Sequence, residues 1–438
     1  MLARLRAALE TPIDVASLAL FRALFGALLF AGTVRLLAKG FVHEAFILPR
    51  FLFAPWPLQS VLVPLPGAGM YVVYGAIAAL SLAVALGLFT RVASALLCVL
   101  FTYAHFLDLT NYLNHYWLVT LLTALLAVLP GAGGALSLDA RLWPQKRRSH
   151  VATWVLYLFR FQVALVYFFA GATKLRHDWL FLAEPMRIWL GANADMPIVG
   201  PLFRQTWTAY VMSFAGALYD LTIPLWLLFP RSRPFAFATV VTFHLVTARL
   251  FNIGMFPFFM MAASTLFFDP SWVRQKLRLG AHVPDVEPAG QRAPLAALAL
   301  YAVVQIALPL RGRLYDGNLL WHEQGYRFAW NVMLMEKMGS AEFSLVDRES
   351  GARRLVRLRD HLTRSQEKAM ATQPDMILAF AQHLATEEHR AGRDVGVFAD
   401  VYVVLNGRPA ARFVDPSVDL GREADGFGPK RWILPAPH

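Results

Sequence analysis

Nine long apolar runs in the first 310 residues constrain the fold of this chain more than any other feature. They cover residues 15–36, 69–89, 92–108, 115–130, 151–173, 208–229, 234–250, 253–268 and 293–309. A helix needs about 20 mostly apolar residues to cross a bilayer, and it satisfies every backbone amide within itself. Because 57% of the residues are hydrophobic and only 16% are charged, an ordinary soluble enzyme is disfavoured. We predict an integral membrane α-helical bundle of about nine spans over residues 1–310.

Charged residues are distributed unevenly, which predicts the orientation of the bundle. Residues 1–310 contain 23 basic and 12 acidic residues, whereas residues 311–438 contain 18 and 17. Between the apolar runs, thirteen basic residues fall in loops on the side of the N-terminus and seven in the opposite loops. The positive-inside rule therefore predicts a cytoplasmic N-terminus, and an odd number of spans places residues 311–438 outside the cytoplasm. The excess positive charge indicates membrane lipid as a partner and no nucleic acid.

Residues 311–438 have the pattern of an extramembrane, β-rich α+β domain. We expect strands at 327–335, 341–347 and 353–358, a turn at 348–351, and a helix through 365–390 that is interrupted or begins near Pro374. Asn406-Gly407 separates two further strands, 397–405 and 409–415, and is the dipeptide most typical of a tight hairpin. Residues 280–292 have the composition of a linker. Cys98 is the single cysteine, so no disulfide can form within the chain.

Ionisable residues inside the predicted spans need a physical reason, since each costs at least about 2.5–3.5 kcal/mol at mid-membrane. Arg160 and Asp220 lie near the middle of neighbouring spans, so a structural ion pair between them is one explanation and a functional role the other. Lys174 closes its span fourteen residues after Arg160, about 21 Å along a helix, at the outer boundary. His115 begins a span on the same side, and His244 lies in the outward half of another.

Two interpretations of Lys174, His115 and His244 remain open. A lysine at the end of a span often extends its amine to the interface, and a single membrane histidine often only packs between helices. Alternatively, since the orientation places all three toward one face, a lysine and a histidine beside an apolar chamber would activate a lipid-soluble, weakly acidic substrate. The chain has no CxxC, HExxH, Walker A or GxSxG motif, and His322-Glu323 lacks a second histidine, so the sequence predicts no metal site.

Seven segments carry a family resemblance: DVASLALFRALFG (14–26), NHYW (114–117), YFFAGATKLRHDWL (167–180), FHLVTARLFNIGMFPFF (243–259), GYRFAWNVMLMEK (325–337), FVDPSVDL (413–420) and RWILP (431–435). In this order they resemble the vitamin K-dependent γ-glutamyl carboxylases, with their HTTM membrane domain and a β-sandwich-like extramembrane domain. The resemblance implies an enzyme that oxidises reduced vitamin K to its epoxide with O2. The strong oxygen base generated in this oxidation would remove the γ-proton of a peptide glutamate, and the carbanion would capture CO2.

The resemblance also assigns roles to particular residues. Lys174 matches the family's essential lysine, which would help to deprotonate the hydroquinone, and His115 matches the essential histidine, which would stabilise or position the carbanion. Asn114, His244 and Arg249 match positions near the quinone.

The chain departs from the animal members of this family. Thr173 and Leu113 stand where those members have a second lysine and a second asparagine, and Arg249 stands where they have a glutamine. A composition rich in Ala, Leu and Arg suits a bacterium. We therefore expect a bacterial inner-membrane protein whose quinol is reduced vitamin K or menaquinol, with O2 and CO2 as further co-substrates and no metal.

The sequence leaves alternatives open for the residues that bind the substrate and for the activity. Trp321, Tyr326, Arg327 and Trp330 directly follow the last predicted span, so they either form the face that binds an exported glutamate-containing peptide or belong to the core of the domain. Three functions fit the sequence: a quinol-coupled carboxylase, a quinol epoxidase or oxidase without peptide carboxylation, and a non-catalytic membrane protein that binds a partner or lipid.

Overall fold

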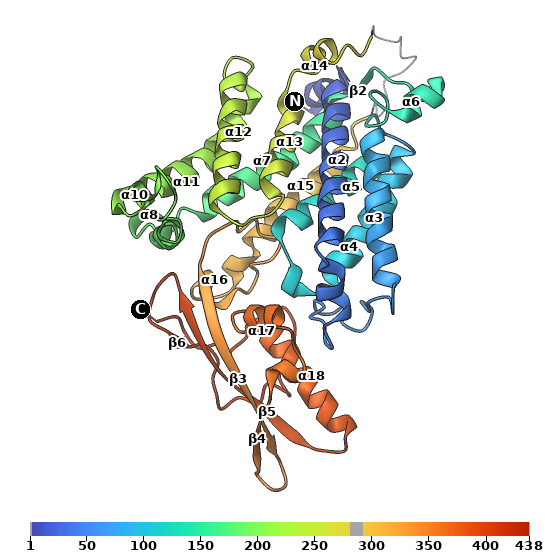
Figure 1. Cartoon of the computed structure of the whole chain (residues 1–438). Helices are drawn as coiled ribbons and strands as arrows, with labels where there is room; N and C mark the ends of the chain where they lie inside the picture. Colours follow the sequence, from blue (N-terminus) through green and yellow to red (C-terminus); the bar gives the residue numbers. More distant parts are fainter. Residues whose placement is uncertain (1, 281–291, 438) are drawn as a thin grey trace.

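The computed structural model describes residues 2–280 and 292–437, so the linker predicted at 280–292 lies almost wholly outside the described residues. Figure 1 shows a helical bundle that packs end-on against a smaller domain built around a sheet. The bundle contains the helices α1 (Leu2–Glu10), α2 (Ala16–Ala38), α3 (Gly69–Leu86), α4 (Thr90–Phe106), α5 (Asn114–Val128), α6 (Leu138–Leu142), α7 (Thr153–Thr173), α8 (His177–Phe181), α9 (Met186–Gly191), α10 (Gly200–Phe203), α11 (Thr206–Leu228), α12 (Arg233–Leu250), α13 (Phe256–Ser264), α14 (Pro270–Lys276) and α15 (Leu295–Leu310). Single π or 3-10 turns are η1 (His43–Ile47), η2 (Leu109–Asn111), η3 (Pro144–Lys146), η4 (Thr265–Phe267) and η5 (Arg311–Leu314).

Helices occupy all nine of the ranges that the apolar runs predicted. Five of the helices described are long and apolar enough to cross a membrane, namely α2, α3, α7, α11 and α15 continued through η5. Three further predicted spans correspond to shorter apolar helices: α4, α5 and the segment from α13 through η4. The remaining predicted span, 234–250, corresponds to α12. This helix has an arginine near each end and belongs neither to the five candidate spans nor to the shorter apolar helices.

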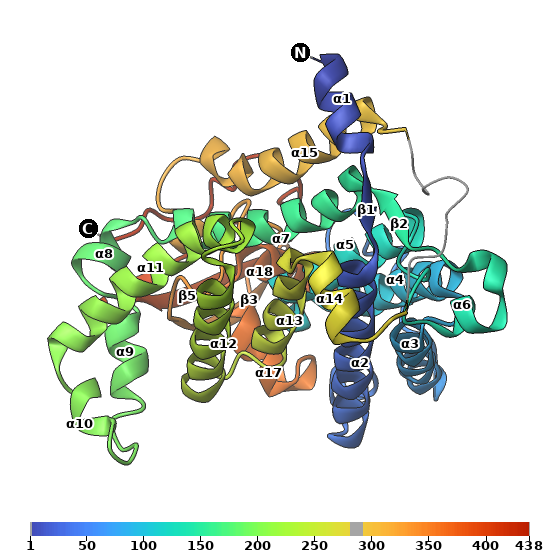
Figure 2. The ribbon, with the colours of Figure 1, turned by 90° about the horizontal axis from the view of Figure 1, so that it is seen from above.

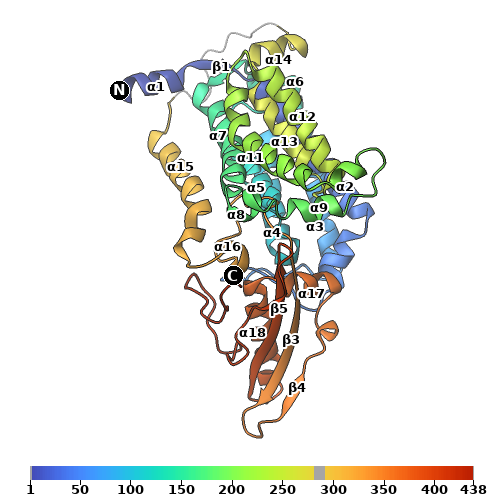
Figure 3. The same cartoon turned by 90° about the vertical axis from the view of Figure 1, so that its left-hand side faces the viewer.

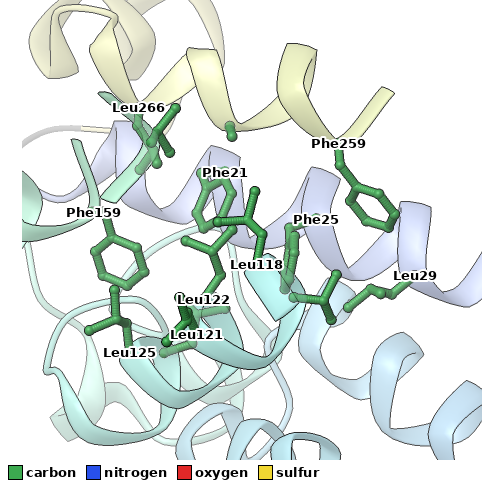
Figure 4. Packing of buried hydrophobic residues seen from close by; sticks show 14 of the residues in the cluster. Phe21, Phe25, Leu29, Leu118, Leu121, Leu122, Leu125, Phe159, Phe259 and Leu266 are labelled. Atoms are coloured by element: carbon green, nitrogen blue, oxygen red, sulfur yellow. The ribbon is translucent and has the colours of Figure 1, made fainter. Parts of the chain in front are cut away.

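α2 lies at the centre of the bundle core. Figure 4 shows Phe21, Phe25 and Leu29 of α2 among Leu118, Leu121, Leu122 and Leu125 of α5, Phe159 of α7, Phe259 of α13 and Leu266 of η4. Arg22 is fully buried on the same helix, and its guanidinium donates hydrogen bonds to the carbonyls of Ala85 and Ala132 at 2.8 and 2.9 Å. It thereby satisfies carbonyl groups that a helix end and a loop leave unpaired.

The edges of the bundle are held by a few polar contacts. Strand β1 (Pro12–Asp14) pairs antiparallel with β2 (His150–Ala152) and ties the N-terminal segment to the start of α7. α15 lies along α7 at the margin of the bundle (Figures 2 and 3), and only 11% of its apolar window is buried. The Tyr301 hydroxyl of α15 donates to the Gln162 side chain of α7 at 2.6 Å. α15 therefore presents most of its apolar surface outward.

The C-terminal domain is one antiparallel sheet covered by helices. Its strands are β3 (Lys337–Asp347), β4 (Arg353–Leu355), β5 (Val395–Leu405) and β6 (Ala411–Arg412), in the order β4-β3-β5-β6, and its other elements are α16 (Leu319–His322), η6 (Leu358–Asp360), α17 (Arg364–Met370) and α18 (Pro374–Arg390). Asn406 and Gly407 both have positive φ, as the predicted hairpin requires, and β5 pairs with β6. The predicted helix through 365–390 is interrupted before Pro374, where α18 begins.

Two predictions for this domain were wrong. Residues 327–335 form no strand, because Phe328, Trp330 and Met333 have positive φ, which breaks an extended backbone. The segment instead turns repeatedly beneath the bundle. The domain is also no β-sandwich: within residues 292–437 the only sheet is the four-stranded one, and its core is completed by α18, whose buried residues pack against β3 and β5.

Candidate active site

Two adjoining cavities lie where the bundle meets the C-terminal domain. The first, the lysine cavity, measures about 640 Å³ and is lined by Lys174, Asp220, Tyr167, Tyr219, His244 and Trp179 among others. The second, the histidine cavity, measures about 540 Å³ and is lined by His115, Asn114, His105, Arg35, Tyr326 and Arg327 among others. Ile253 and Phe256 before and at the start of α13, and Val332 and Met333 of the irregular 327–335 segment, line both cavities. The C-terminal domain therefore contributes to the wall that the cavities share.

A buried ion pair occupies the lysine cavity. The Lys174 ammonium lies 2.7 Å from Asp220 Oδ2, donates to the Ala170 carbonyl at 3.1 Å, and stands 5.3 Å from the centre of the Trp179 ring. The residues Lys174 and Asp220 are each only 6% exposed, so the lysine does not extend to the interface. An acid and a base in contact, with an apolar chamber beside them, can hold and move a proton.

Asp220 reaches Lys174 because α7 and α11 cross closely at Gly171. A Cβ placed on Gly171 would lie 2.7 Å from the Leu221 backbone nitrogen, so only glycine permits this approach. The ion pair predicted between Arg160 and Asp220 does not form. The Arg160 guanidinium instead donates to the carbonyls of Leu266, in η4, and of Phe268, directly after it. Carbonyls at such a helix end have no partner within the helix.

Three polar groups complete the lysine cavity. His244 Nε2 lies 3.0 Å from the Tyr167 hydroxyl, which also approaches the Ser264 hydroxyl at 3.4 Å. The Tyr219 hydroxyl is buried close to the Tyr167 hydroxyl and makes no hydrogen bond of standard geometry with any residue that the structure describes. Because an unpaired buried hydroxyl is costly, this group is suited to a polar atom of a bound molecule.

The rest of the lysine cavity is apolar and extends to the outer flank of the bundle. Its lining includes Phe235 and Val246 of α12, which are 74% and 44% exposed on the surface of the helices. A molecule with an aromatic head and an apolar tail can thus reach the Lys174–Asp220 pair from a lipid environment.

The histidine cavity is more polar. His115 stacks on Phe256, with ring centres 5.4 Å apart. The Asn114 side chain accepts a hydrogen bond from the Tyr112 hydroxyl at 3.1 Å and donates to the Asn331 carbonyl at 3.1 Å. Asn114 therefore lines the same cavity as His115, whereas Lys174 and His244 line the lysine cavity.

Two further groups in the histidine cavity are available to a ligand. Both ring nitrogens of the buried His105 lack a hydrogen-bond partner within the described part of the chain. The exposed Arg35 side chain at the end of α2 likewise makes no hydrogen bond or ion pair with a described residue. An unpaired guanidinium at the cavity wall is the group best suited to a carboxylate.

The predicted substrate-binding residues divide into two pairs. Tyr326 and Arg327 line the histidine cavity, and Arg327 is bound to Asp375 through Nε–Oδ2 at 3.1 Å and Nη2–Oδ1 at 3.2 Å. Burial raises the pKa of Asp375, but the ion pair with Arg327, together with the charge of Lys430 and the backbone N–H of Met376, leaves that pKa lowered. Trp321 and Trp330 are 2% and 1% exposed and belong to the two main cores, so their assignment to a substrate face is corrected.

The segment after Lys174 is clamped to the C-terminal domain. Asp178 of α8 accepts hydrogen bonds from both terminal nitrogens of Arg408, at 2.8 and 2.7 Å, and one from Asn406 at 2.9 Å. The hydrogen bonds from Arg408, followed by that from Asn406, lower the pKa of Asp178 against the effect of burial. The hairpin at Asn406-Gly407 thus holds the exit of α7 in place.

The sequence identified several of the residues that line the two cavities and missed others. His244 and Lys174 share the lysine cavity as expected, whereas Arg249 is exposed at the end of α12 and lines neither cavity. Tyr167, Tyr219, His105 and Arg35 were not identified. Tyr167 lies seven residues before Lys174, on the same face after two helical turns, a spacing that offered a usable signal. For Tyr219, His105 and Arg35 the sequence offered no such signal.

Two protein-family models match the chain. Residues 10–272 match the HTTM domain, and residues 290–438 match the lumenal domain of vitamin K-dependent gamma-carboxylase. No solved structure matches the chain. The two matches occur in sequence and the first alone covers more than half of the residues. The chain therefore belongs to the vitamin K-dependent γ-carboxylase family.

Proposed function

We propose that this protein couples the oxidation of a reduced naphthoquinone, vitamin K hydroquinone or menaquinol, to the carboxylation of glutamate in an exported peptide. One observation carries the proposal: an apolar cavity with a lysine–aspartate pair shares a wall with a polar cavity that contains a histidine and an unpaired arginine. The membership of the family supplies vitamin K as the general co-substrate. The two cavities suit two substrates that arrive from lipid and from water.

In the lysine cavity, Lys174 and Asp220 would act together as the base for the quinol. The pair is electrically neutral whether the proton resides on the amine or on the carboxylate, so burial does not strongly oppose the transfer between them. Asp220 can therefore take the lysine proton and leave a neutral amine to accept the quinol proton. The Tyr219 hydroxyl and the Tyr167–His244 pair would orient the quinol oxygens.

The overall reaction balances without a further oxidant. O2 takes four electrons from the quinol, two as the hydroquinone is oxidised and two as the ring double bond is epoxidised, and one of its oxygen atoms enters the epoxide while the other leaves as water. The glutamate γ C–H bond breaks, its proton passes to the oxygen base, and its electron pair forms the new C–C bond with CO2. In the histidine cavity, Arg35 would bind the glutamate carboxylate and His115 would lie beside the reacting carbon.

Product analysis tests the proposal. Purified protein in lipid nanodiscs is incubated with quinol, O2, labelled bicarbonate and a glutamate peptide, and epoxide and γ-carboxyglutamate are measured separately. We expect both products, loss of both in Lys174→Ala, and preferential loss of carboxylation in His115→Ala. His177→Ala, an exposed histidine outside both cavities, is the matched control and should retain both.

The same assay separates the alternatives. Epoxide formation without carboxylated peptide would reject the coupled reaction in favour of quinol epoxidation alone. Unchanged turnover in Lys174→Ala would reject both enzymatic functions, and quinol-independent binding of a partner with no turnover would favour a binding protein.

A further inference from the structure

A cluster of two histidines and a glutamate lies in the C-terminal domain, among residues that line neither cavity. His361 follows η6, and His383 and Glu387 lie one turn apart on α18. The His361 Nδ1 atom is 3.3 Å from Glu387 Oε2, and His383 Nε2 is 3.4 Å from Glu387 Oε1. The three ligand atoms lie within 4.8 Å of one another. Both histidines are partly buried, at 25% and 21% side-chain exposure, while the Glu387 side chain is 45% exposed.

The separation of each histidine nitrogen from a Glu387 oxygen is close to that between neighbouring ligands of one metal ion, with each histidine facing a different oxygen. A tetrahedral zinc ion with bonds of about 2.0–2.1 Å holds neighbouring ligand atoms about 3.3–3.4 Å apart. A hydrogen bond between nitrogen and oxygen is typically shorter, at about 2.7–3.2 Å. In the described part of the chain, the side chains of His361, His383 and Glu387 contact one another as ion pairs and make no hydrogen bond to any other residue. The histidine ring nitrogens and the Glu387 carboxylate oxygens are therefore available to bind a metal ion.

We propose that His361, His383 and Glu387 bind a divalent transition-metal ion of the zinc class, with water as a fourth ligand. Two imidazoles and one carboxylate suit zinc, whereas calcium and magnesium prefer oxygen ligands alone. The spacing of His383 and Glu387 places both on one face of α18, so the helix presents two ligands without rearrangement. Only the loop side chain of His361 has to close on the ion.

The ion would stabilise the contact between the C-terminal domain and the helical bundle. The His383 ring stacks on Phe51 of the loop after α2, with centres 4.2 Å apart. Arg50 of the same loop donates to the Asp360 carbonyl at 3.1 Å, next to His361. A metal at this position links α18 to the segment after β4 and fixes both against the loop from the bundle.

Zinc binding to the full-length protein tests this site. Metal-free protein in detergent, with any affinity tag removed, is titrated with zinc chloride while bound zinc and the melting temperature are measured. We expect one tightly bound equivalent, a higher melting temperature, and no effect of magnesium or calcium. His361→Ala and His383→Ala should each weaken binding at least tenfold. Glu387→Gln alters an exposed side chain, so it tests the site even if a histidine variant fails to fold.

His389→Ala is the matched control, because His389 is an exposed histidine on the same helix. It should bind zinc like the wild type. Undiminished binding in His361→Ala, His383→Ala and Glu387→Gln, or an equal loss in His389→Ala, would overturn the proposal. No activity measurement enters this test, so its outcome is independent of the proposed function.

Discussion

Asp220→Asn is the substitution that most directly tests the Lys174–Asp220 pair. Asparagine preserves the size and hydrogen-bonding shape of the side chain but removes its charge and its ability to take a proton. The Lys174 ammonium is then left with uncharged acceptors only, the new amide oxygen at position 220 and the Ala170 carbonyl. The ammonium would be an uncompensated buried charge.

The size of the effect on stability follows from burial. Removing one partner of a buried ion pair costs about 3–5 kcal/mol. For 438 residues, an unfolding entropy of about 2.1 cal/mol/K per residue gives roughly 0.9 kcal/mol/K in total, so the melting temperature should fall by about 3–5 °C. Positioned acid–base groups contribute about 100- to 10,000-fold to rate, so quinol oxidation should fall at least about 100-fold.

Thermal unfolding in detergent and epoxide formation in nanodiscs measure the two effects. The double variant Lys174→Met/Asp220→Leu removes both charges and should recover the melting temperature without recovering activity. Asp195→Asn, in an exposed ion pair with Arg204 at 3.5 Å, is the control and should change neither. Normal turnover in Asp220→Asn would refute the proton-transfer role, and a double variant as unstable as the single one would refute the buried-charge reasoning.

Three further predictions address other parts of the site. Tyr219→Phe removes the unpaired hydroxyl and should raise the quinol KM several-fold with the peptide KM unchanged; equal quinol KM values would exclude a contact with the quinol. Arg35→Gln should raise the glutamate-peptide KM at least tenfold and leave peptide-free epoxidation intact, which steady-state kinetics on both substrates would check. The pKa of Asp178 is lower in the folded protein than in the unfolded chain, where it is about 4. The contact of Asp178 with Arg408 and Asn406 therefore contributes its full stability above about pH 4 and loses it as the pH falls further. The melting temperature of the wild type should therefore fall more between pH 6 and about pH 3 than that of Arg408→Gln, and parallel curves would contradict this.

The pattern of the sequence determined the helices and several of the turns. Apolar runs long enough for a bilayer predict helices from local composition alone, and each of the nine ranges is helical. Asn406-Gly407 specified its hairpin because few residues accept two successive positive φ angles. The resemblance of the segments around Lys174 and His115 also identified the family correctly. All of these signals reside in short stretches of chain.

Only the tertiary structure decided which charged groups meet. From the sequence, Asp220 had Arg160 on the preceding span as a plausible partner. The close crossing at Gly171 gives it Lys174 instead. The wall that the two cavities share likewise includes residues of the 327–335 segment. The apolar residues of this segment alternate as in a strand, but its backbone turns repeatedly where it lies against the bundle. Helix formation is governed by neighbours along the chain, whereas the partner of a buried charge depends on crossing angles and burial set by residues far apart in sequence.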